Sequence, residues 1–399
     1  MKRYGIFLLI LMLMCVTLSF AAEGEQGKYT ASEVDIKRER RVLFDEDIKW
    51  ATSRKATDEI VERIAKAGFN VYIPCVWHGR GASFATRFSH IEPMVAARVN
   101  SGDDPLAYLL KQAHRRGLEV HPWFTVMLRL DDRYPMFYAP ETPGDSYDVH
   151  NAAFRQFIVA LMADMVKRYP VDGINLDYIR SAGTCECASC TADYERRYKR
   201  SLHRDARDAA RPAARVPTIE SWHGEAVSAI VREVSSSVRP IKPGIVISVD
   251  GHPLAGRLLL QGQDSVLWEK KGWIDVIFSM DCRLEPDLKA ADAARAALRD
   301  SAALTLLQTV FDLVPRERVT GDERRRIAEY VGGRAVVSRE PGTLAGYVRM
   351  SRRNWPGSGV AFYHYRQLTD AHITVLRSSV FRENVPPAWP QTVKRDGKS

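Results

Sequence analysis

Short apolar runs alternate along the chain with longer segments in which apolar residues recur at helical spacing. The short runs are typical of buried strands, and the longer spacing is typical of helices with one buried face. One helix is well marked, because Asp104 suits its N-cap, Pro105 its first turn and Gly117 its end. The predicted helices cover about residues 57–67, 105–116, 152–165, 219–238, 266–270 and 288–298. The predicted strands are residues 41–44, 70–76, 118–124, the segment up to Asp177, 245–250, 274–280, 304–311 and 360–365.

Eight strands with intervening helices in one domain are what a (β/α)8 TIM barrel needs. An open, doubly wound sheet is the alternative fold. It is disfavoured because no glycine-rich phosphate loop follows an early strand. The expected order along the chain is a signal peptide at 1–22, the barrel domain at 30–385 and a polar tail at 386–399.

The N-terminus resembles a secretory signal peptide, since a basic start precedes an apolar core at 6–16 and residues 19–21 fit a cleavage site. The apolar run is too short for a stable membrane span. Cys15 would suit a lipoprotein, but the bulky Met14 before it favours plain secretion. A periplasmic or extracellular location is therefore expected.

Composition adds one constraint. Hydrophobic residues make up 45% and charged residues 27% of the chain, and the formal net charge is +9. These fractions are ordinary for a globular domain. The excess positive charge is spread over Arg-rich helices, so solvated helix faces explain it more simply than attraction to anionic polysaccharide. No nucleic-acid-binding motif is recognisable, and a nucleic-acid partner is not expected.

The segment Asp172 to Arg180 places two polar residues on one face of an apolar strand. Asn175 and Asp177 share that face because side chains alternate along a strand. An acid there is costly to bury unless it has a partner or a role. In barrel enzymes the active groups lie at the C-terminal ends of strands, which makes Asp177 the leading candidate. The structural alternative is an acid that pairs with Arg180 and only holds the barrel together.

Cleavage of a glycosidic bond typically needs two carboxyl groups, one to protonate the leaving oxygen and one to attack or to activate water. Asp177 is the expected nucleophile or base, and Arg180 or Asn175 would keep it ionised. Asp250 at the end of the fifth strand and Asp281 after the sixth are the candidates for the acid. Either could instead be a structural acid.

The strand ends also supply aromatic and polar side chains of the kind that bind sugars. Aromatic faces can stack on the apolar faces of sugar rings, and polar groups can bind the hydroxyls. Histidines inside a barrel are also common without any role in binding. The expected substrate contacts are Trp77, His78, Arg80, His121, Trp123, Asn175, Tyr178, Arg180 and His364.

Cys185, Cys187 and Cys190 form a compact motif that could bind structural zinc through thiolates. The alternative is a local disulfide, Cys185–Cys190 or Cys187–Cys190, in an oxidising compartment. Without a signal peptide the chain would hold five cysteines, an odd number that favours a metal or a free thiol. No other cofactor is expected. The candidates for a fourth zinc ligand are Cys282, His203 and Asp193.

Four segments resemble the glycosyl hydrolase-like 10 family, and one of them, Ser248-Val-Asp250-Gly, is similar to the end of its strand five. Asp172-Gly-Ile-Asn-Leu-Asp177-Tyr-Ile-Arg180 is similar to the strand-four signature of that family. His114 to Phe124 is similar to its passage into strand three, and Gly359 to Tyr363 to its strand eight. The resemblance implies a barrel hydrolase of the bacterial envelope or exterior that acts on polysaccharide or on peptidoglycan glycan strands. It also implies that Asp177 is the catalytic acidic residue of the motif.

Two other classes of function fit parts of this pattern. A non-catalytic carbohydrate-binding barrel would keep the aromatic residues but place no second carboxyl group near Asp177. A metal-dependent polysaccharide hydrolase or deacetylase would hold a metal at the barrel mouth, although no HExxH spacing supports it. The sequence as a whole favours an exported glycosidase with a poly- or oligosaccharide substrate.

Overall fold

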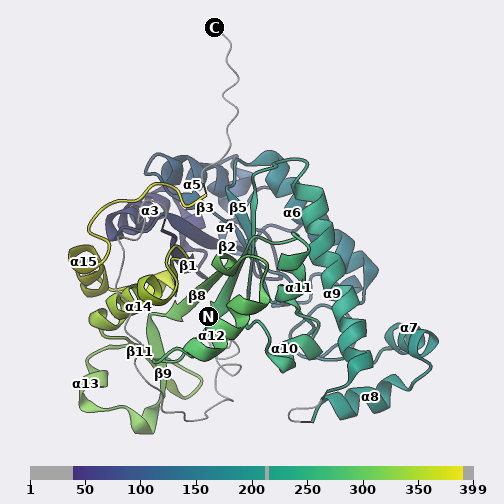
Figure 1. Ribbon diagram of the computed structural model, residues 1–399. Helices are drawn as coiled ribbons and strands as arrows, with labels where there is room; N and C mark the ends of the chain where they lie inside the picture. Colours follow the sequence, from purple (N-terminus) through teal and green to yellow (C-terminus); the bar gives the residue numbers. More distant parts are fainter. Residues whose placement is uncertain (1–38, 212–214, 390–399) are drawn as a thin grey trace.

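Eight parallel strands close into a barrel in the computed structural model, which describes residues 39–211 and 215–389 (Figure 1). The first strand pairs with both the second and the last, which closes the sheet. The expected (β/α)8 architecture is confirmed, and the expected signal peptide lies outside the described residues. The barrel strands are β1 (Arg41–Asp45), β2 (Val71–Trp77), β3 (Glu119–Val120) with β4 (Trp123–Thr125), β5 (Gly173–Asp177), β6 (Val246–Gly251), β7 (Val276–Met280), β8 (Leu304–Thr309) and β12 (Val360–Tyr363).

The third barrel strand is interrupted and forms two segments, β3 and β4. Pro122 lies between them, and proline has no backbone N–H to donate to a neighbouring strand. Both segments nevertheless pair with β2. The strand predicted over 118–124 is therefore in the right place but broken in its middle.

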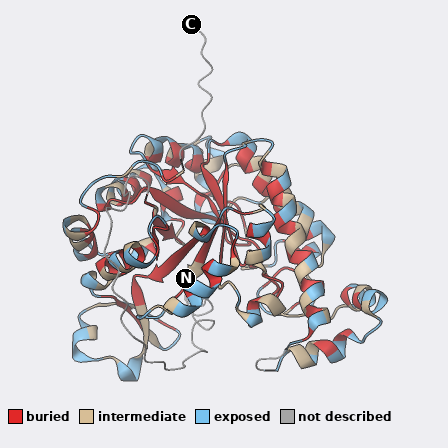
Figure 2. Cartoon of the chain, in the orientation of Figure 1, coloured by how far each residue is buried: buried red, intermediate tan, exposed pale blue. Residues whose placement is uncertain are grey.

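Helices surround the barrel and turn their buried faces toward it (Figure 2). Helix α6 buries Phe154, Ile158 and Leu161, which belong to the stripe expected from the sequence. Helix α5 begins where expected, because the Asp104 side chain accepts hydrogen bonds from its first turn. The helices are α2 (Lys49–Thr52), α3 (Arg54–Ala67), α4 (Pro93–Asn100), α5 (Pro105–His114), α6 (Ala152–Arg168), α7 (Ala188–Tyr198), α8 (Leu202–Ala209), α9 (Pro217–Val238), α10 (Gly256–Leu260), α11 (Ser265–Lys270), α12 (Leu288–Ala297), α13 (Gly321–Arg324), α14 (Pro341–Asn354) and α15 (Asp370–Ser379).

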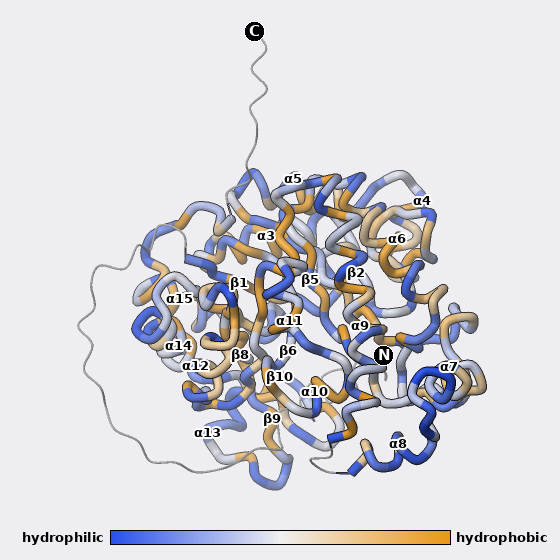
Figure 3. Tube along the Cα trace, turned by 45° about the vertical axis from the view of Figure 1, so that its right-hand side comes forward, coloured by the Kyte–Doolittle hydropathy of each residue, from blue (hydrophilic) through white to orange (hydrophobic). Residues whose placement is uncertain are grey.

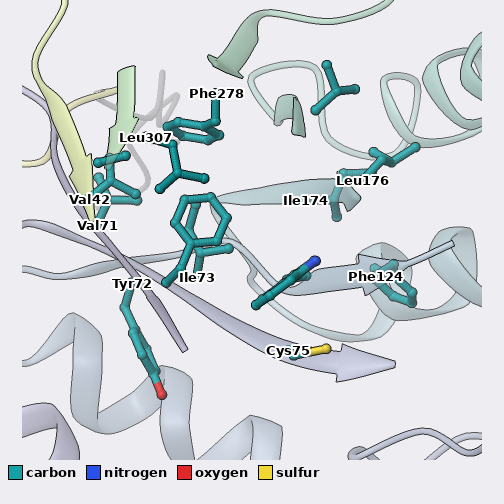
Figure 4. Close-up of a cluster of buried hydrophobic side chains, with 14 of the residues drawn as sticks. Val42, Val71, Tyr72, Ile73, Cys75, Phe124, Ile174, Leu176, Phe278 and Leu307 are labelled. Atoms are coloured by element: carbon teal, nitrogen blue, oxygen red, sulfur yellow. The ribbon is translucent and has the colours of Figure 1, made fainter. Parts of the chain in front are cut away.

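Aromatic rings from several strands fill the middle of the barrel. Phe44 of β1 meets Phe278 of β7 edge to face at 5.1 Å, and it meets Trp123 of β4 at 5.6 Å. Figure 4 shows Phe278 and Leu307 within the same buried cluster. Such aromatic pairs contribute about 0.5–1.5 kcal/mol each beyond the area that they bury. The barrel interior is thus a packed core that supports the residues above it at the strand ends.

A small antiparallel sheet follows β8 and was not expected from the sequence. Its strands are β9 (Phe311–Pro315), β10 (Ile327–Val331) and β11 (Arg334–Ser338), with β11 in the centre. The strand predicted over 304–311 was too long, since β8 ends at Thr309 and Phe311 already belongs to β9. The sheet lies beside α13, at the lower edge of Figure 1.

Helices α7 and α8 form a lobe that projects from the barrel, and many of their residues are hydrophilic (Figures 1 and 3). The lobe has a small buried cluster of its own, separate from the main core. A short run of chain after β5 leads into it. The cluster consists of Cys185, Cys190, Tyr194, Leu202, Val216, Ile219 and Trp222.

The last described residues pack against the end of the barrel where the strands begin. The backbone N–H of Trp389 donates to Glu119 Oε1 at 2.8 Å, and its ring lies 5.3 Å from that of His121. Trp389, in the segment expected to be a polar tail, therefore contacts the barrel. Among the described helices, none combines the length and the apolar content that crossing a membrane requires.

Candidate active site

Two of the expected acids lie at the mouth of the barrel, the end where the strands finish. Asp177 is the last residue of β5, and Asp250 is close to the end of the adjacent strand β6. Both side chains are almost fully buried, with 1% of the surface of Asp177 and 2% of that of Asp250 exposed. Their charges interact, so the two carboxyl groups titrate as a pair.

Asp177 stays ionised at neutral pH despite its burial. Burial raises its pKa to about 6, and the charge of Arg180 is the largest influence in the opposite direction. The backbone N–H of Tyr178 donates to Asp177 Oδ1 at 2.6 Å, and the indole of Trp123 also lowers the pKa. A carboxylate with a pKa slightly below neutrality suits a base or a nucleophile.

The pKa of Asp250 is shifted upward as well. Burial and then the charge of Asp177 raise its pKa well above the usual value, while a hydrogen bond from Asn175 lowers it. Asn175 Nδ2 donates to Asp250 Oδ1 and to Ser248 Oγ, each at 3.0 Å. Asn175 is fully buried, so the structure places it as a support for Asp250 within the barrel.

A third acid at the mouth, Glu46, was missed from the sequence. It directly follows β1, it is half-buried, and its carboxyl group accepts a hydrogen bond from the Tyr363 hydroxyl at the end of β12. Burial raises its pKa to about 8; the Tyr363 hydrogen bond opposes this rise, and neighbouring acids including Asp177 add to it. At neutral pH, a protonated Glu46 therefore lies close enough to an ionised Asp177 for their charges to interact. Such a difference in pKa between two neighbouring carboxyl groups lets one act as an acid and the other as a base.

The direction of Glu46 follows from the alternation of side chains along β1. Asp45, one residue earlier, is fully buried and accepts a hydrogen bond from the Tyr72 hydroxyl at 2.6 Å. Phe44 faces the barrel interior, so Asp45 faces outward and Glu46 inward again. The run Asp45-Glu46-Asp47 at the end of the first strand was the signal that could have identified this acid.

Arg180 and Tyr178 pack together beside Asp177. The guanidinium carbon of Arg180 lies 4.7 Å from the centre of the Tyr178 ring. Tyr178 has a positive φ of 49°, which turns the chain away from the strand directly after Asp177. Arg180 is buried, and its Nη1 has no hydrogen-bond partner among the described residues.

His78 and Arg80 follow β2, and His78 lies next to Glu46 at the end of the first strand. Burial and then the charge of Arg80 lower the pKa of His78 to about 3, against a hydrogen bond with the backbone of Glu46. His78 is therefore a neutral group at the mouth. Arg80 forms a bidentate ion pair with Glu92, at 2.6 and 2.9 Å, which fixes its guanidinium group against a neighbouring loop.

The structure separates the two tryptophans that were expected to stack on sugar. Trp123 lies inside the barrel, where its ring meets Tyr363 at 6.3 Å and its indole lowers the pKa of Asp177. Trp77 follows a register shift in the pairing of β2 with β4, and such a shift moves side chains to the other face. Its ring packs on Phe157 of α6 at 5.6 Å, outside the barrel.

Three further expected residues are His121, His364 and Asp281. His121 lies near the start of its strand, with Nε2 at 3.4 Å from Glu119 Oε2, at the end of the barrel opposite the mouth. His364 follows β12 at the mouth, where burial lowers its pKa to about 3. Asp281 follows β7, and its carboxylate accepts hydrogen bonds from Arg283 Nε at 2.9 Å and Nη2 at 2.8 Å.

Several of the buried polar atoms that have no hydrogen-bond partner among the described residues lie at the mouth, and others lie elsewhere in the molecule. Buried polar groups normally have partners, so a group of such atoms indicates a place for water or for a polar ligand. The residues that carry them lie at or shortly after the ends of β5, β6, β8 and β12, or after helix α10. The atoms are Arg180 Nη1, Ser181 Oγ, His252 Nε2, Gln261 Oε1, Gln263 Oε1, Thr309 Oγ1 and both ring nitrogens of His364.

The three cysteines after β5 gather with an acid that the sequence did not indicate. The ligand atoms of Asp148, Cys185, Cys187 and Cys190 lie within 4.8 Å of one another. No disulfide forms among the cysteines that the structure describes. The three residues that the sequence offered as a fourth zinc ligand do not belong to this group. They are Cys282, His203 and Asp193.

Comparison with known sequences finds one family and several relatives. The family model described as Glycosyl hydrolase-like 10 matches residues 41–139 and 146–305. Glycosyl hydrolase DigH of Escherichia coli K12 is 27% identical over 38% of this chain and 36% of the relative. Glycosyl hydrolase YngK of Bacillus subtilis 168 is 24% identical over 37% of this chain and 29% of the relative. The chain thus spans about a third of the length of these curated relatives.

Solved structures with the same architecture share little sequence with this chain. An α-L-fucosidase isoenzyme from Paenibacillus thiaminolyticus matches with a TM-score of 0.56 at 14% identity, over 86% of this chain and 49% of the other. A β-galactosidase from Bacillus circulans matches with 0.55 at 10%, over 83% and 51%. The β-amylase catalytic domain from Paenibacillus polymyxa matches with 0.54 at 8%, over 88% and 99%. At these identities the likeness supports the barrel fold alone.

Proposed function

The chain belongs to the glycosyl hydrolase-like 10 family, and from this membership and its acids we propose that it hydrolyses O-glycosidic bonds in a polysaccharide or in peptidoglycan glycan strands. The observation that carries the proposal is the contrast between Asp177, with a pKa of about 6, and its neighbour Glu46, with a pKa of about 8; burial also raises the pKa of Asp250. Glycoside cleavage needs such a contrast, because one carboxyl group must donate a proton while another attacks or activates water. The relatives named glycosyl hydrolase agree with this reading.

In the proposed mechanism Asp177 is the nucleophile or base, and Glu46 is the acid. Glu46 is preferred over Asp250 because part of its surface is exposed, whereas Asp250 is sealed beneath the mouth and held by Asn175. A general acid must come within hydrogen-bond reach of the leaving oxygen. Asp281 is not preferred, because the side chain of Arg283 already occupies its carboxylate.

The polar atoms at the mouth fit a ligand rich in hydroxyl groups, which can donate and accept at once. Arg180 Nη1 and Gln263 Oε1 would bind such hydroxyls, and His364 could contribute either ring nitrogen. Tyr178 and Trp123 would provide the aromatic surface. The amino-terminal segment supports export, which we also propose; appearance of the chain outside the cytoplasm in cell fractions would test it.

Reducing-end release from a panel of polysaccharides and peptidoglycan, measured with wild type and Asp177→Asn, tests the proposal. We expect release by wild type and not by Asp177→Asn on at least one substrate. Asp145→Asn is the matched control, since Asp145 is an exposed acid in another loop and should leave the rate unchanged. Binding of a substrate by wild type without any release would instead favour a carbohydrate-binding barrel.

The choice of acid can be tested separately once a substrate is found. An aryl glycoside with a good leaving group needs no proton from the enzyme, so loss of the acid should matter little for it. We expect Glu46→Gln to lose about 10²–10⁴-fold in rate on the natural linkage and to keep most of its rate on the aryl glycoside. If Asp250→Asn shows this pattern and Glu46→Gln does not, the acid is Asp250.

A further inference from the structure

The cysteine loop and a distant acid form a compact group of potential metal ligands. Asp148 lies in the chain between β4 and α6, Cys185 and Cys187 lie between β5 and α7, and Cys190 is in the first turn of α7. Their ligand atoms all lie within 4.8 Å of one another. A tetrahedral zinc site with metal–sulfur bonds of about 2.3 Å needs ligand atoms roughly 3.8 Å apart. The group is therefore already close to the dimensions of a zinc site.

Contacts around the group hold its members in place. The two oxygens of Asp148 have different roles, because Oδ1 accepts the backbone N–H of His150 at 2.9 Å while Oδ2 lies 3.2 Å from Cys190 Sγ. The Thr142 hydroxyl lies 3.4 Å from Cys185 Sγ. Such outer contacts orient the ligands of metal sites and leave the coordinating atoms directed inward.

The chemistry of the four groups selects for a soft divalent metal. Three thiolates with one carboxylate suit Zn²⁺, whereas Mg²⁺ and Ca²⁺ prefer oxygen ligands throughout. Four protein ligands also leave no open position for a substrate or a catalytic water, which is the pattern of structural zinc. Buried next to each other, a carboxyl group and three thiols have only weak hydrogen bonds to offer one another.

We propose that Asp148, Cys185, Cys187 and Cys190 bind one Zn²⁺ in a closed structural site. On binding, the three thiols release their protons and Asp148 coordinates as a carboxylate, so thiolate and carboxylate lone pairs form the four bonds to the metal. No oxidation or reduction is involved. The site differs from the disulfide alternative, which would link two of the cysteines and leave Asp148 without a role.

The proposed site would join two loops that lead away from the barrel mouth. One follows β4, and the other follows β5, whose last residue is Asp177. The α7–α8 lobe depends on a small satellite cluster that includes Cys185 and Cys190. Small units with little core commonly need a metal or a disulfide to be stable. Zinc at this position would therefore hold the lobe to the barrel.

Metal analysis of the full-length protein tests the proposal without reference to activity. We expect about one zinc per chain after desalting, and loss of that zinc in Cys187→Ser and Cys190→Ser. Asp145→Ala and Cys282→Ala are the matched controls, because neither residue belongs to the group, and both should retain zinc. Cobalt(II) substituted into wild type should show thiolate-to-metal charge transfer and the visible bands of a tetrahedral site.

The role of Asp148 needs variants of its own. Asp148→Ala should weaken zinc binding by more than about 10-fold, since even outer-shell partners contribute that much. Asp148→Cys should restore binding with a fourth thiolate. Unchanged zinc affinity in Asp148→Ala would overturn the assignment of Asp148 as a ligand.

Thiol titration of the denatured, unreduced wild type separates zinc from a disulfide. With zinc, every cysteine of the chain should react once a chelator is present. Two fewer reactive thiols than cysteines, together with no zinc in the purified protein, would overturn the proposal. Both readouts are independent of glycoside hydrolysis, so the zinc site and the proposed function can fail separately.

Discussion

Replacing Asp177 by asparagine should stabilise the folded protein at neutral pH while it abolishes turnover. The pKa of Asp177 is about 6 in the folded protein against a usual value of 3.8, with burial as the main cause. Keeping this side chain ionised in the fold at pH 7 therefore costs about 3 kcal/mol, from a shift of roughly two pKa units. The shift already includes the favourable influence of Arg180. Asparagine is neutral and of similar size, so it should recover most of this cost.

The pH dependence of this effect has a defined sign. The folded protein binds the Asp177 proton more tightly than the unfolded chain, so the cost is absent below the unfolded pKa. It grows as the pH rises toward the folded pKa of about 6 and is constant above it. The stability difference between Asp177→Asn and wild type should therefore be about 1 kcal/mol at pH 4.5 and about 3 kcal/mol at pH 7.

Urea unfolding of both proteins at a series of pH values measures this difference. Asp281→Asn is the comparison, because Asp281 is buried but holds Arg283 and the backbone N–H of Asp287. The Asp281→Asn variant should lose about 1–3 kcal/mol of its free energy of unfolding, since the substitution breaks hydrogen bonds to a charged group. An Asp177→Asn variant that is less stable than wild type at pH 7, or whose stability difference does not change with pH, would refute the reasoning.

The remaining predictions concern the pH profile and two positions in the barrel wall. The rate of hydrolysis should rise with pH through a pKa near 6, as Asp177 ionises, and fall through a pKa near 8, as Glu46 loses its proton. Tyr363→Phe should move the alkaline limb of this profile to higher pH, because the Tyr363 hydrogen bond lowers the pKa of Glu46. Trp77→Ala should lower the free energy of unfolding, measured with urea, by about 3–5 kcal/mol. The variant protein that remains folded should bind saccharide as tightly as wild type. Gly173→Ala should lower the thermal midpoint, because its added Cβ would lie 2.7 Å from the backbone oxygen of Val246 and 2.5 Å from His121 Nδ1; an unchanged midpoint would contradict this packing.

Much of the fold could be predicted from the sequence, because capping residues mark the positions where several helices begin or end. Asp104, Asn151 and Gly68 cap helices in the structure at the positions where the sequence placed helix ends. The antiparallel sheet after β8 was not anticipated, because strands β9 and β10 are short and partly exposed and carry no long apolar run. The pairing of such strands depends on contacts between different segments of the chain, and the residue pattern of one strand alone does not reveal these contacts.

The site was only partly accessible from the sequence, for two physical reasons. Trp77 turns outward because of a register shift between β2 and β4, and such shifts arise from the pairing of strands and leave no mark in one strand alone. Glu46 and Asp148 lie far along the chain from Asp177 and from the cysteine motif, and only barrel closure and loop packing bring them near. Asp177 itself was found because its strand carries an unusual acid on the inward face.

The rate of reducing-end release and the affinity for the same oligosaccharide, measured side by side for wild type and Asp177→Asn, test the central claim most directly. We expect the variant to bind the oligosaccharide about as tightly as wild type and to cleave it at least about 10²–10⁴-fold more slowly, because the group that attacks or activates water has been removed. Equal rates for the two proteins would contradict the assignment of Asp177 as the nucleophile or base of a glycosidase.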